Sequence, residues 1–194
     1  MLTDQLAPAK LDPRVKRTRN LLENAFMDLI QEKGFQAVTV QDITERAGVN
    51  RATFYAHFAD KYALLDYRIR QGFLEEIDKR MLNACHLTRD NLRNLIVAVC
   101  EFTRTMNAHC KPAQAQFESL VEAQVKGVLQ ELMRKWLEQV PLTVAPETAA
   151  TASSWAIYGL VLQWSHARQP RPVDEFAAEA LPLVAPMLNL SLAG

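Results

Sequence analysis

Glycine, cysteine and long hydrophobic runs are all scarce in this 194-residue sequence. It has six glycines and no extended alternation of valine, isoleucine or threonine with polar residues, which argues against a β-sheet. Three cysteines, an odd number, lie in segments of helical pattern, which favours reduced thiols over a disulfide framework. No apolar stretch approaches the ~20 residues of a membrane span, and the first dozen residues lack the apolar core of a signal peptide. We therefore expect an all-α, cytoplasmic protein with no membrane partner.

The charge is balanced overall but unevenly distributed. Lysine plus arginine and aspartate plus glutamate each total 22, so the net charge says nothing about a nucleic-acid partner. Residues 10–19, however, carry the basic side chains Lys10, Arg14, Lys16, Arg17 and Arg19 against a single acid. Such a segment suits an end of the molecule that faces phosphates. Without a DNA-binding motif beside it, the same segment would fit the solvated start of a helix equally well.

Residues 39–61 have the pattern of a helix, a tight turn and a second helix. Thr39 is a good helix N-cap, and Asp42 three residues later approaches the capping-box pattern. Gly48 can adopt the positive φ that ends a helix. Asn50 is a second N-cap, which predicts a short helix from Arg51 to Phe58.

The residues expected on the outer side of this second helix have an unusual composition. Phe54 and Phe58 stand four residues apart and predict the buried side. A solvated helix face usually carries glutamate and lysine, but this one has no acid before Asp60. Hydroxyl, imidazole and guanidinium groups are donors to phosphate oxygens and base edges. The outward residues are Arg51, Ala52, Thr53, Tyr55 and His57.

Two strings in this region resemble a known family. AGVNRATFYAHFADKYALL resembles the recognition helix and following turn of the TetR family of bacterial transcriptional regulators. The upstream string RTRNLLENAFMDLIQEKGFQAVTVQDI resembles that family's first helix and the start of its second. The resemblance covers roughly residues 14–65, about a quarter of the chain. The rest is similar to the family only in length and helical character.

The resemblance implies a domain organisation and an assembly. Residues 1–13 would be a disordered tail, 14–60 a helix-turn-helix DNA-binding domain, and 61–194 a helical body for effector binding and dimerisation, with about nine helices in all. The last two long helices would form a four-helix interface in a homodimer. Pro182 and Pro186 fall within the final helix, so we expect it to kink or end near Leu181.

The residues also suggest how DNA would be contacted. We expect Arg51 and Ala52 to contact bases, with Gln41 as a weaker candidate. The phosphate backbone would be contacted by Thr39, Thr53, Tyr55, His57 and Lys61. Lys61 would share a phosphate with the start of its own helix. In the family, the positions that match the last four of these residues commonly touch phosphate or an adjacent base.

The body is predicted as a series of helices divided by prolines. Helices are expected from Asp90 to about residue 106, over 113–117, over 120–140, over 147–168 and from an Asp174 cap onward, with Lys111–Pro112 as a break. Side chains between them could line a pocket for a flat or hydrophobic small molecule, or could simply be core. The candidates are Phe102, Met106, His109, Phe117, Trp136, Trp155, Tyr158, Gln163 and Trp164.

Catalytic and metal-binding signals are weak. The pairs Cys85–His86 and His109–Cys110 lack the spacing of a metal site, because adjacent helical residues point about 100° apart. No nucleophile–base pair or phosphate-binding glycine loop stands out, so we expect that the protein is not an enzyme and binds no metal or cofactor. The favoured function is a repressor released from a palindromic double-stranded DNA operator by a small-molecule effector. The alternative is an activator, or a regulator controlled by a protein partner.

Overall fold

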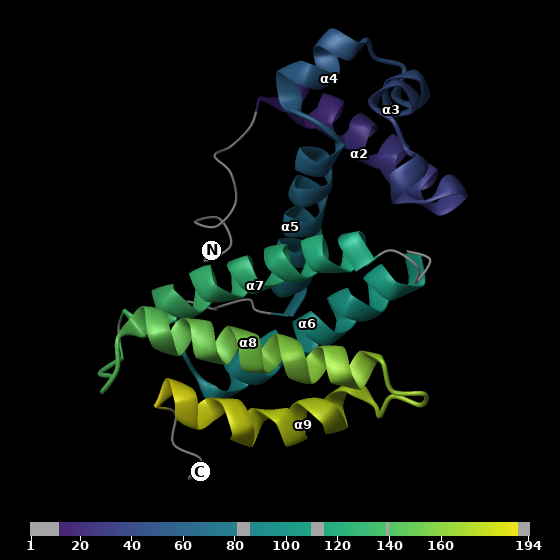
Figure 1. Cartoon of the computed structure of the whole chain (residues 1–194). Coiled ribbons are helices and arrows are strands. Elements are labelled where there is room, and N and C mark those ends of the chain that lie inside the picture. The colour runs from purple at the N-terminus through teal and green to yellow at the C-terminus, as the bar shows by residue number, and fades with distance from the viewer. Residues whose placement is uncertain (1–11, 81–85, 110–114, 139, 190–194) are drawn as a thin grey trace.

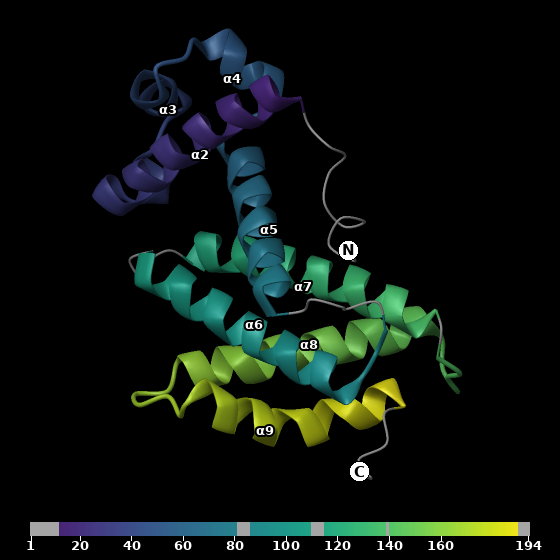
Figure 2. The same cartoon turned by 180° about the vertical axis from the view of Figure 1, so that it is seen from behind.

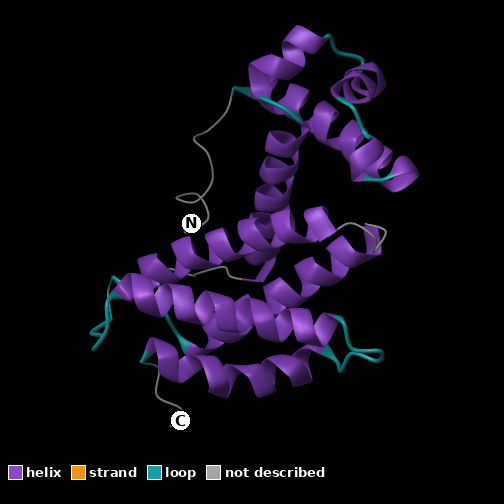
Figure 3. Ribbon diagram, in the orientation of Figure 1, coloured by secondary structure: helices purple, strands orange, loops and turns teal. Residues whose placement is uncertain are grey.

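The computed structural model describes residues 12–80, 86–109, 115–138 and 140–189. These residues form eight α-helices, two short 3-10 helices and no strand, as expected for an all-α chain (Figures 1 and 3). The predicted tail lies almost wholly outside the described ranges. The elements are α2 (Pro13–Lys33), η1 (Phe35–Ala37), α3 (Val40–Ala47), α4 (Arg51–His57), α5 (Lys61–Arg80), α6 (Arg89–His109), α7 (Ala115–Leu137), α8 (Pro146–Ser165), α9 (Val173–Val184) and η2 (Ala185–Leu188).

Helices α2, α3 and α4 form a head at one end of the molecule, and α6 to α9 form a layered body at the other (Figures 1 and 2). Helix α5 runs from the head into the body in both views. One continuous set of buried side chains extends from α2 through α5 to α9. The body therefore supports the head through α5 rather than through a loose linker.

The first helix of the head, α2, begins and ends at residues whose local chemistry favours a helix boundary. Pro13 occupies the first turn of α2, where a missing N–H costs little, and the Asp12 carboxylate accepts a hydrogen bond from the Arg14 backbone N–H at 2.8 Å. Gly34 ends the helix with φ of 78°. The chain then turns inward, and Phe35 is buried with its ring edge-on to Phe26 at 6.2 Å between centroids.

Helix α5 is buried along most of its length. Its apolar side chains form one buried seam, and the helix ends at Arg80. Near its carboxyl end, the ring of Phe73 lies 5.2 Å from that of Phe102 on α6. The buried side chains of this helix are Leu64, Leu65, Ile69, Phe73, Leu74 and Ile77.

The body differs from the predicted helices in two places. Helix α7 is continuous from Ala115 to Leu137, so the predicted break between a short and a long helix after Phe117 is wrong. Asp174 does not cap α9: the helix begins at Val173, and the Asp174 carboxylate instead pairs with Arg93 at 2.7 Å. The inward face of α7 is buried, with five side chains at most 1% exposed, namely Leu129, Leu132, Met133, Trp136 and Leu137.

Of the two expectations for Pro182, a kink or an end near Leu181, the early end is wrong, because α9 continues past this proline. The helix runs to Val184 before the chain tightens into η2, which contains Pro186. Proline in a helix removes one hydrogen bond and crowds the carbonyl four residues earlier. Pro182 and Ala178, the residue that carries this carbonyl, are both exposed, so water can hydrate the freed oxygen. The helix therefore tolerates this proline because it faces outward.

Other structural expectations concern thiols, metals and membranes. Cys100 is a buried free thiol, and burial raises its pKa to about 12, which makes it unreactive. Cys85 and Cys110 lie outside the described residues. Within the described ranges, no three histidine, cysteine or acidic side chains gather as metal ligands would. In the same ranges, no helix combines the length and apolarity needed to cross a bilayer.

Replacing Pro182 with alanine should stabilise the protein. The substitution restores an N–H donor to the Ala178 carbonyl inside α9, worth up to about 3 kcal/mol, less about 1 kcal/mol from a freer unfolded chain. We expect the free energy of unfolding to rise by about 1–2 kcal/mol in urea denaturation. Pro172, which precedes the helix, is the matched control, and Pro172→Ala should bring no gain. Equal effects of the two substitutions would contradict this account of Pro182.

Candidate nucleic-acid interface

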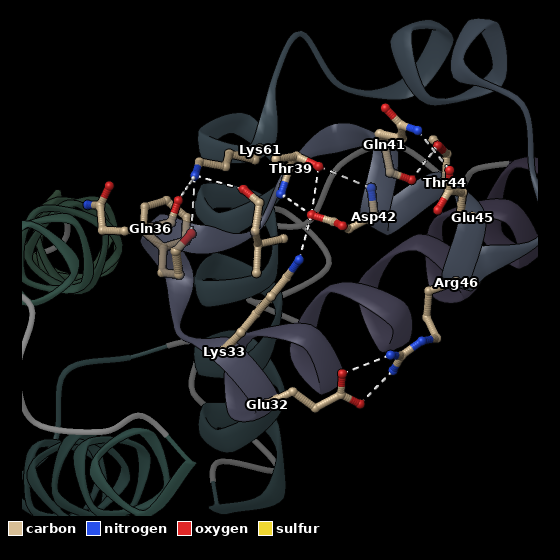
Figure 4. Close-up of polar contacts among 12 residues, drawn as sticks. Glu32, Lys33, Gln36, Thr39, Gln41, Asp42, Thr44, Glu45, Arg46 and Lys61 are labelled. Atoms are coloured by element: carbon tan, nitrogen blue, oxygen red, sulfur yellow. Dashed lines mark hydrogen bonds and ion pairs between the residues drawn. The ribbon is translucent and has the colours of Figure 1, made fainter.

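Helix α3 starts with the predicted capping box, shown in Figure 4. The Thr39 hydroxyl accepts from the Asp42 backbone N–H at 3.2 Å, and the Thr39 backbone N–H donates to the Asp42 carboxylate at 2.7 Å. Lys33 on α2 contributes an ion pair to the same carboxylate oxygen at 2.7 Å. Hydrogen bonding to Lys33 and Thr39 holds the pKa of Asp42 well below its usual range. The start of α3 is thereby attached to the end of α2.

A second contact attaches the other end of α3. The Arg46 guanidinium donates two parallel hydrogen bonds to the Glu32 carboxylate of α2, both at 2.8 Å (Figure 4). Such a two-point pair fixes orientation as well as distance. Helix α3 is therefore held against α2 at both ends, and α4 is presented from a rigid support.

The turn between α3 and α4 follows the sequence signals closely. Gly48 adopts the left-handed conformation with φ of 67°, and the Val49 N–H donates to the Thr44 carbonyl at 3.0 Å. Asn50 then caps α4, its side-chain oxygen accepting from the Thr53 backbone N–H at 2.7 Å. These local bonds set the angle at which α4 leaves the turn.

The inner side of α4 packs on both neighbouring helices. Phe54 and Phe58 are buried, as predicted. The Arg19 guanidinium of α2 lies over the Phe58 ring at 5.5 Å and over the Tyr67 ring of α5 at 4.8 Å. This cation–π contact joins α2, the end of α4 and α5. Arg19, which the sequence marked only as part of a basic segment, is therefore a packing residue of the head.

The outer side of α4 carries donors without partners. Arg51, Ala52 and Tyr55 are exposed, and His57 is half-buried. Among the described residues, the side chains of Arg51, Tyr55 and His57 form no hydrogen bond or ion pair. Burial and the nearby charge of Arg19 lower the pKa of His57, so its ring is neutral near pH 7. These three groups can donate to phosphate or base edges without breaking an existing bond.

Three other candidates already use their donors within the head. The Thr39 hydroxyl donates to Asp42 at 2.6 Å and the Thr53 hydroxyl to Asn50 at 2.9 Å. The side-chain amide of Gln41 donates to Glu45 at 2.9 Å (Figure 4). A contact from any of them to DNA requires exchange of this internal bond.

Lys61 is placed differently from the expectation. Its ammonium donates to the backbone carbonyls of Phe35 at 3.1 Å, Gln36 at 3.1 Å and Val38 at 2.9 Å, which Figure 4 shows converging on the nitrogen. The same nitrogen lies 4.8 Å from the centre of the Phe35 ring. Burial lowers the pKa of Lys61. An ammonium has three N–H donors, so in this arrangement none is left for a phosphate.

A basic surface adjoins α4. Both views place the amino end of α2 beside α4 (Figures 1 and 2). The basic side chains Arg14, Lys16 and Arg17 of this end are exposed. The surface around α4 is therefore positive although the whole chain is neutral.

The structure does not bring the predicted pocket residues together. Trp136 and Tyr158 are buried core residues. Trp155 is 58% exposed on α8, where the Lys126 ammonium lies 4.0 Å from its ring centre. The side chains of His109 and Phe117 lie outside the described residues.

The other candidates from the pocket set line two separate cavities. Phe102 and Met106 line a cavity of about 160 Å³ between α2, α5 and α6. Gln163 and Trp164 line another of about 260 Å³ at the corner between α8 and α9. Helical periodicity indicates which side chains face inward but not which cavity they reach. The sequence therefore could not show that these residues line two cavities.

Three helices with a capped helix–turn–helix, a positive outer face and a helical body define a helix-turn-helix DNA-binding protein. Residues 22–67 match the family model described as bacterial regulatory proteins, tetR family. This match covers the helix-turn-helix head, and it relates the chain to the TetR family of bacterial transcriptional regulators.

The relatives match mainly in the head. The transcriptional regulator YxbF of Bacillus subtilis is 43% identical over 70 residues, 36% of this chain and 18% of the relative. The chain likewise spans only 27% of YdeS, another regulator of that organism. The regulator EthR of Mycolicibacterium smegmatis is 27% identical over 161 residues, which cover 81% of this chain and 74% of EthR.

Solved structures extend the likeness to the whole fold. A TetR-family regulator from Streptomyces coelicolor aligns with a TM-score of 0.66 at 17% identity, over 93% of this chain and 99% of its own. SmeT, solved in complex with triclosan, aligns with a TM-score of 0.52 at 16% identity, over 88% and 90% of the two chains. At these identities the likeness establishes the fold.

Replacing Lys61 with methionine should destabilise the head rather than remove a phosphate contact. Three carbonyls lose a charged donor, and we expect the free energy of unfolding to fall by about 2 kcal/mol. A phosphate contact would contribute about 1 to the slope of log affinity against log salt. We expect this slope, measured on duplex DNA, to stay unchanged.

Lys61→Arg is the matched control. A planar guanidinium cannot direct its donors to three converging carbonyls, so arginine should restore the charge but little of the stability. Full stability of Lys61→Met together with a slope reduced by about one would instead make Lys61 a phosphate ligand.

Proposed function

We propose that the protein is a homodimeric repressor that binds a palindromic double-stranded operator and is released by a small molecule. The observation that carries the DNA-binding part is the outer face of α4, which presents three unpaired donors and no acid. The amino-terminal residues of a recognition helix contact base edges in the major groove. Two such helices, held by a dimer, would address half-sites about 34–36 Å apart.

Each residue has a proposed role in this complex. Arg51 and Ala52, both exposed in the first turn of α4, contact bases. Tyr55 and His57 donate to backbone phosphates, and the basic end of α2 adds charge nearby. Thr39, Thr53 and Gln41 join by exchanging their internal bonds.

The dimer is proposed to form through α8 and α9. Large apolar side chains remain exposed here, with Trp155 on α8 at 58%, Leu183 on α9 at 57% and Met187 on the following η2 at 44%. An exposed apolar surface of this kind is typical of an interaction site. A second copy of the chain would cover it and give the two-fold symmetry that a palindrome requires.

Release is proposed to act through α5. This helix joins the head to the body, so a ligand that prefers one position of α5 changes the distance between the two copies of α4. The effect on DNA affinity equals the ligand's difference in affinity for the two positions, typically about 1–3 kcal/mol. The triclosan complex of SmeT supports a small-molecule ligand for a protein of this fold.

Selection of bound duplexes from a random pool tests the operator. We expect a two-fold symmetric sequence with half-sites one helical turn apart. Against it, Arg51→Ala should lose about 1–3 kcal/mol of discrimination at one or two base pairs of each half-site. Arg134→Ala, which removes an exposed arginine from α7, is the control and should bind as the native protein does. An asymmetric site, or unchanged discrimination in Arg51→Ala, would oppose the proposal.

Charge placed in the proposed interface tests the dimer. Leu183→Glu should shift the protein to a monomer in light scattering, because the glutamate would be buried without a partner. Operator affinity should fall with it, since a single head contacts only one half-site. Val144, 51% exposed in the loop before α8, gives the matched control Val144→Glu. Dimerisation of Leu183→Glu at native strength would place the interface elsewhere.

A further inference from the structure

The cavity between α2, α5 and α6 lies where the head meets the body. One side is formed by Met27 of α2, and the opposite side by Phe102 and Met106 of α6. A Cβ on Gly72 of α5 would lie 2.6 Å from the Arg68 guanidinium and 3.4 Å from the Phe102 ring, so glycine at this position gives room to both groups. The apolar lining consists of Met27, Leu65, Ile69, Phe102 and Met106.

The size of this space limits the apolar part of any occupant. Its volume is about 160 Å³. An engineered apolar cavity of about 150 Å³ in another protein holds benzene. A single ring or a short branched chain therefore fits, while a polycyclic molecule does not.

The charged side chains around the opening are mostly paired. Glu76 accepts a hydrogen bond from Lys79 at 3.0 Å and pairs with Arg80. The Arg68 guanidinium faces the Glu23 carboxylate of α2 at 3.9 Å. Glu75 is the exception, because it is exposed and has no hydrogen bond or ion pair among the described residues.

Glu75 lies close enough to Glu23 of α2 for the two carboxylates to repel each other. Burial raises the pKa of Glu23, Arg68 lowers it, Glu75 raises it again, and Arg19 lowers it. A cation beside Glu75 would weaken the repulsion between the two carboxylates, whereas an anion would add to it.

We propose that this cavity binds a small amphipathic amine, with one ring or a short branched chain inside and a single ammonium group against Glu75. The ligand would contact α2 and α6 at once and so fix the head relative to the body. Its effect on operator binding rests on the proposed function, but the binding itself does not.

Binding is tested on the free protein without DNA. Benzylamine, benzyl alcohol and benzoate share one ring and differ in charge. We expect benzylamine at millimolar concentration to raise the melting temperature and to saturate in calorimetry, benzyl alcohol to bind about tenfold more weakly, and benzoate not to bind.

Two variants separate charge from volume. Glu75→Gln should reduce benzylamine to the affinity of benzyl alcohol. Glu138→Gln removes an equal charge from the exposed end of α7 and should leave the tenfold preference intact. Met106→Trp should fill the cavity and abolish both ligands. Circular dichroism checks that Met106→Trp still folds. If this variant does not fold, the result with Glu75→Gln alone decides whether the amine binds at this site.

The proposed amine site would be wrong if benzoate bound with the same affinity as benzylamine. It would also be wrong if Glu75→Gln still preferred benzylamine to benzyl alcohol. The proposed function fails separately. A protein that binds the amine through Glu75 but ignores every duplex would keep the cavity and lose the operator. A protein that selects a palindrome but shows no amine binding would keep the operator and lose the cavity.

Discussion

The shared burial of α5 is the constraint on which the molecule depends. Near its start, Tyr62 packs edge-on against Phe35 at 5.2 Å and Tyr67 packs against Phe58 at 5.5 Å, both in the head. Further along, Arg70 donates to Glu131 of α7 at 2.6 Å and Phe73 contacts α6. Close-packed interiors transmit small displacements instead of absorbing them. A shift of α5 therefore cannot leave either end of the molecule unchanged.

Hydrogen bonds in the head divide its polar side chains into two groups. One group, including Thr39, Thr53 and Lys61, is used to hold helices and turns in place. The other, including Arg51 and Tyr55, makes no hydrogen bond within the described part of the chain and faces outward. A rigid support with free donors reduces the ordering cost of binding, which is the general advantage of preorganised surfaces. The internal bonds of the first group thus serve recognition indirectly.

The sequence predicted most of the head because its signals act over short distances. A capping residue bonds to a backbone group two or three positions away, as at Thr39 and Asn50, and a glycine such as Gly48 needs only its own φ. The same reasoning was weaker in the body. It divided α7 after Phe117 and gave α9 a cap at Asp174, because neither boundary depends on local chemistry alone.

By itself, the sequence determined the helical class, the capped helix–turn–helix, the outward side of α4 and the absence of acid there. The tertiary structure alone decided that the Lys61 ammonium meets carbonyls 23 to 26 positions earlier in the chain. It alone showed that Pro182 faces solvent, that the described pocket candidates separate, and that Glu75, beside a cavity, has no hydrogen bond or ion pair to any described residue. The physical reason is range. Caps and turns are satisfied by near neighbours, whereas the partner of a long side chain depends on which distant helix packs against it.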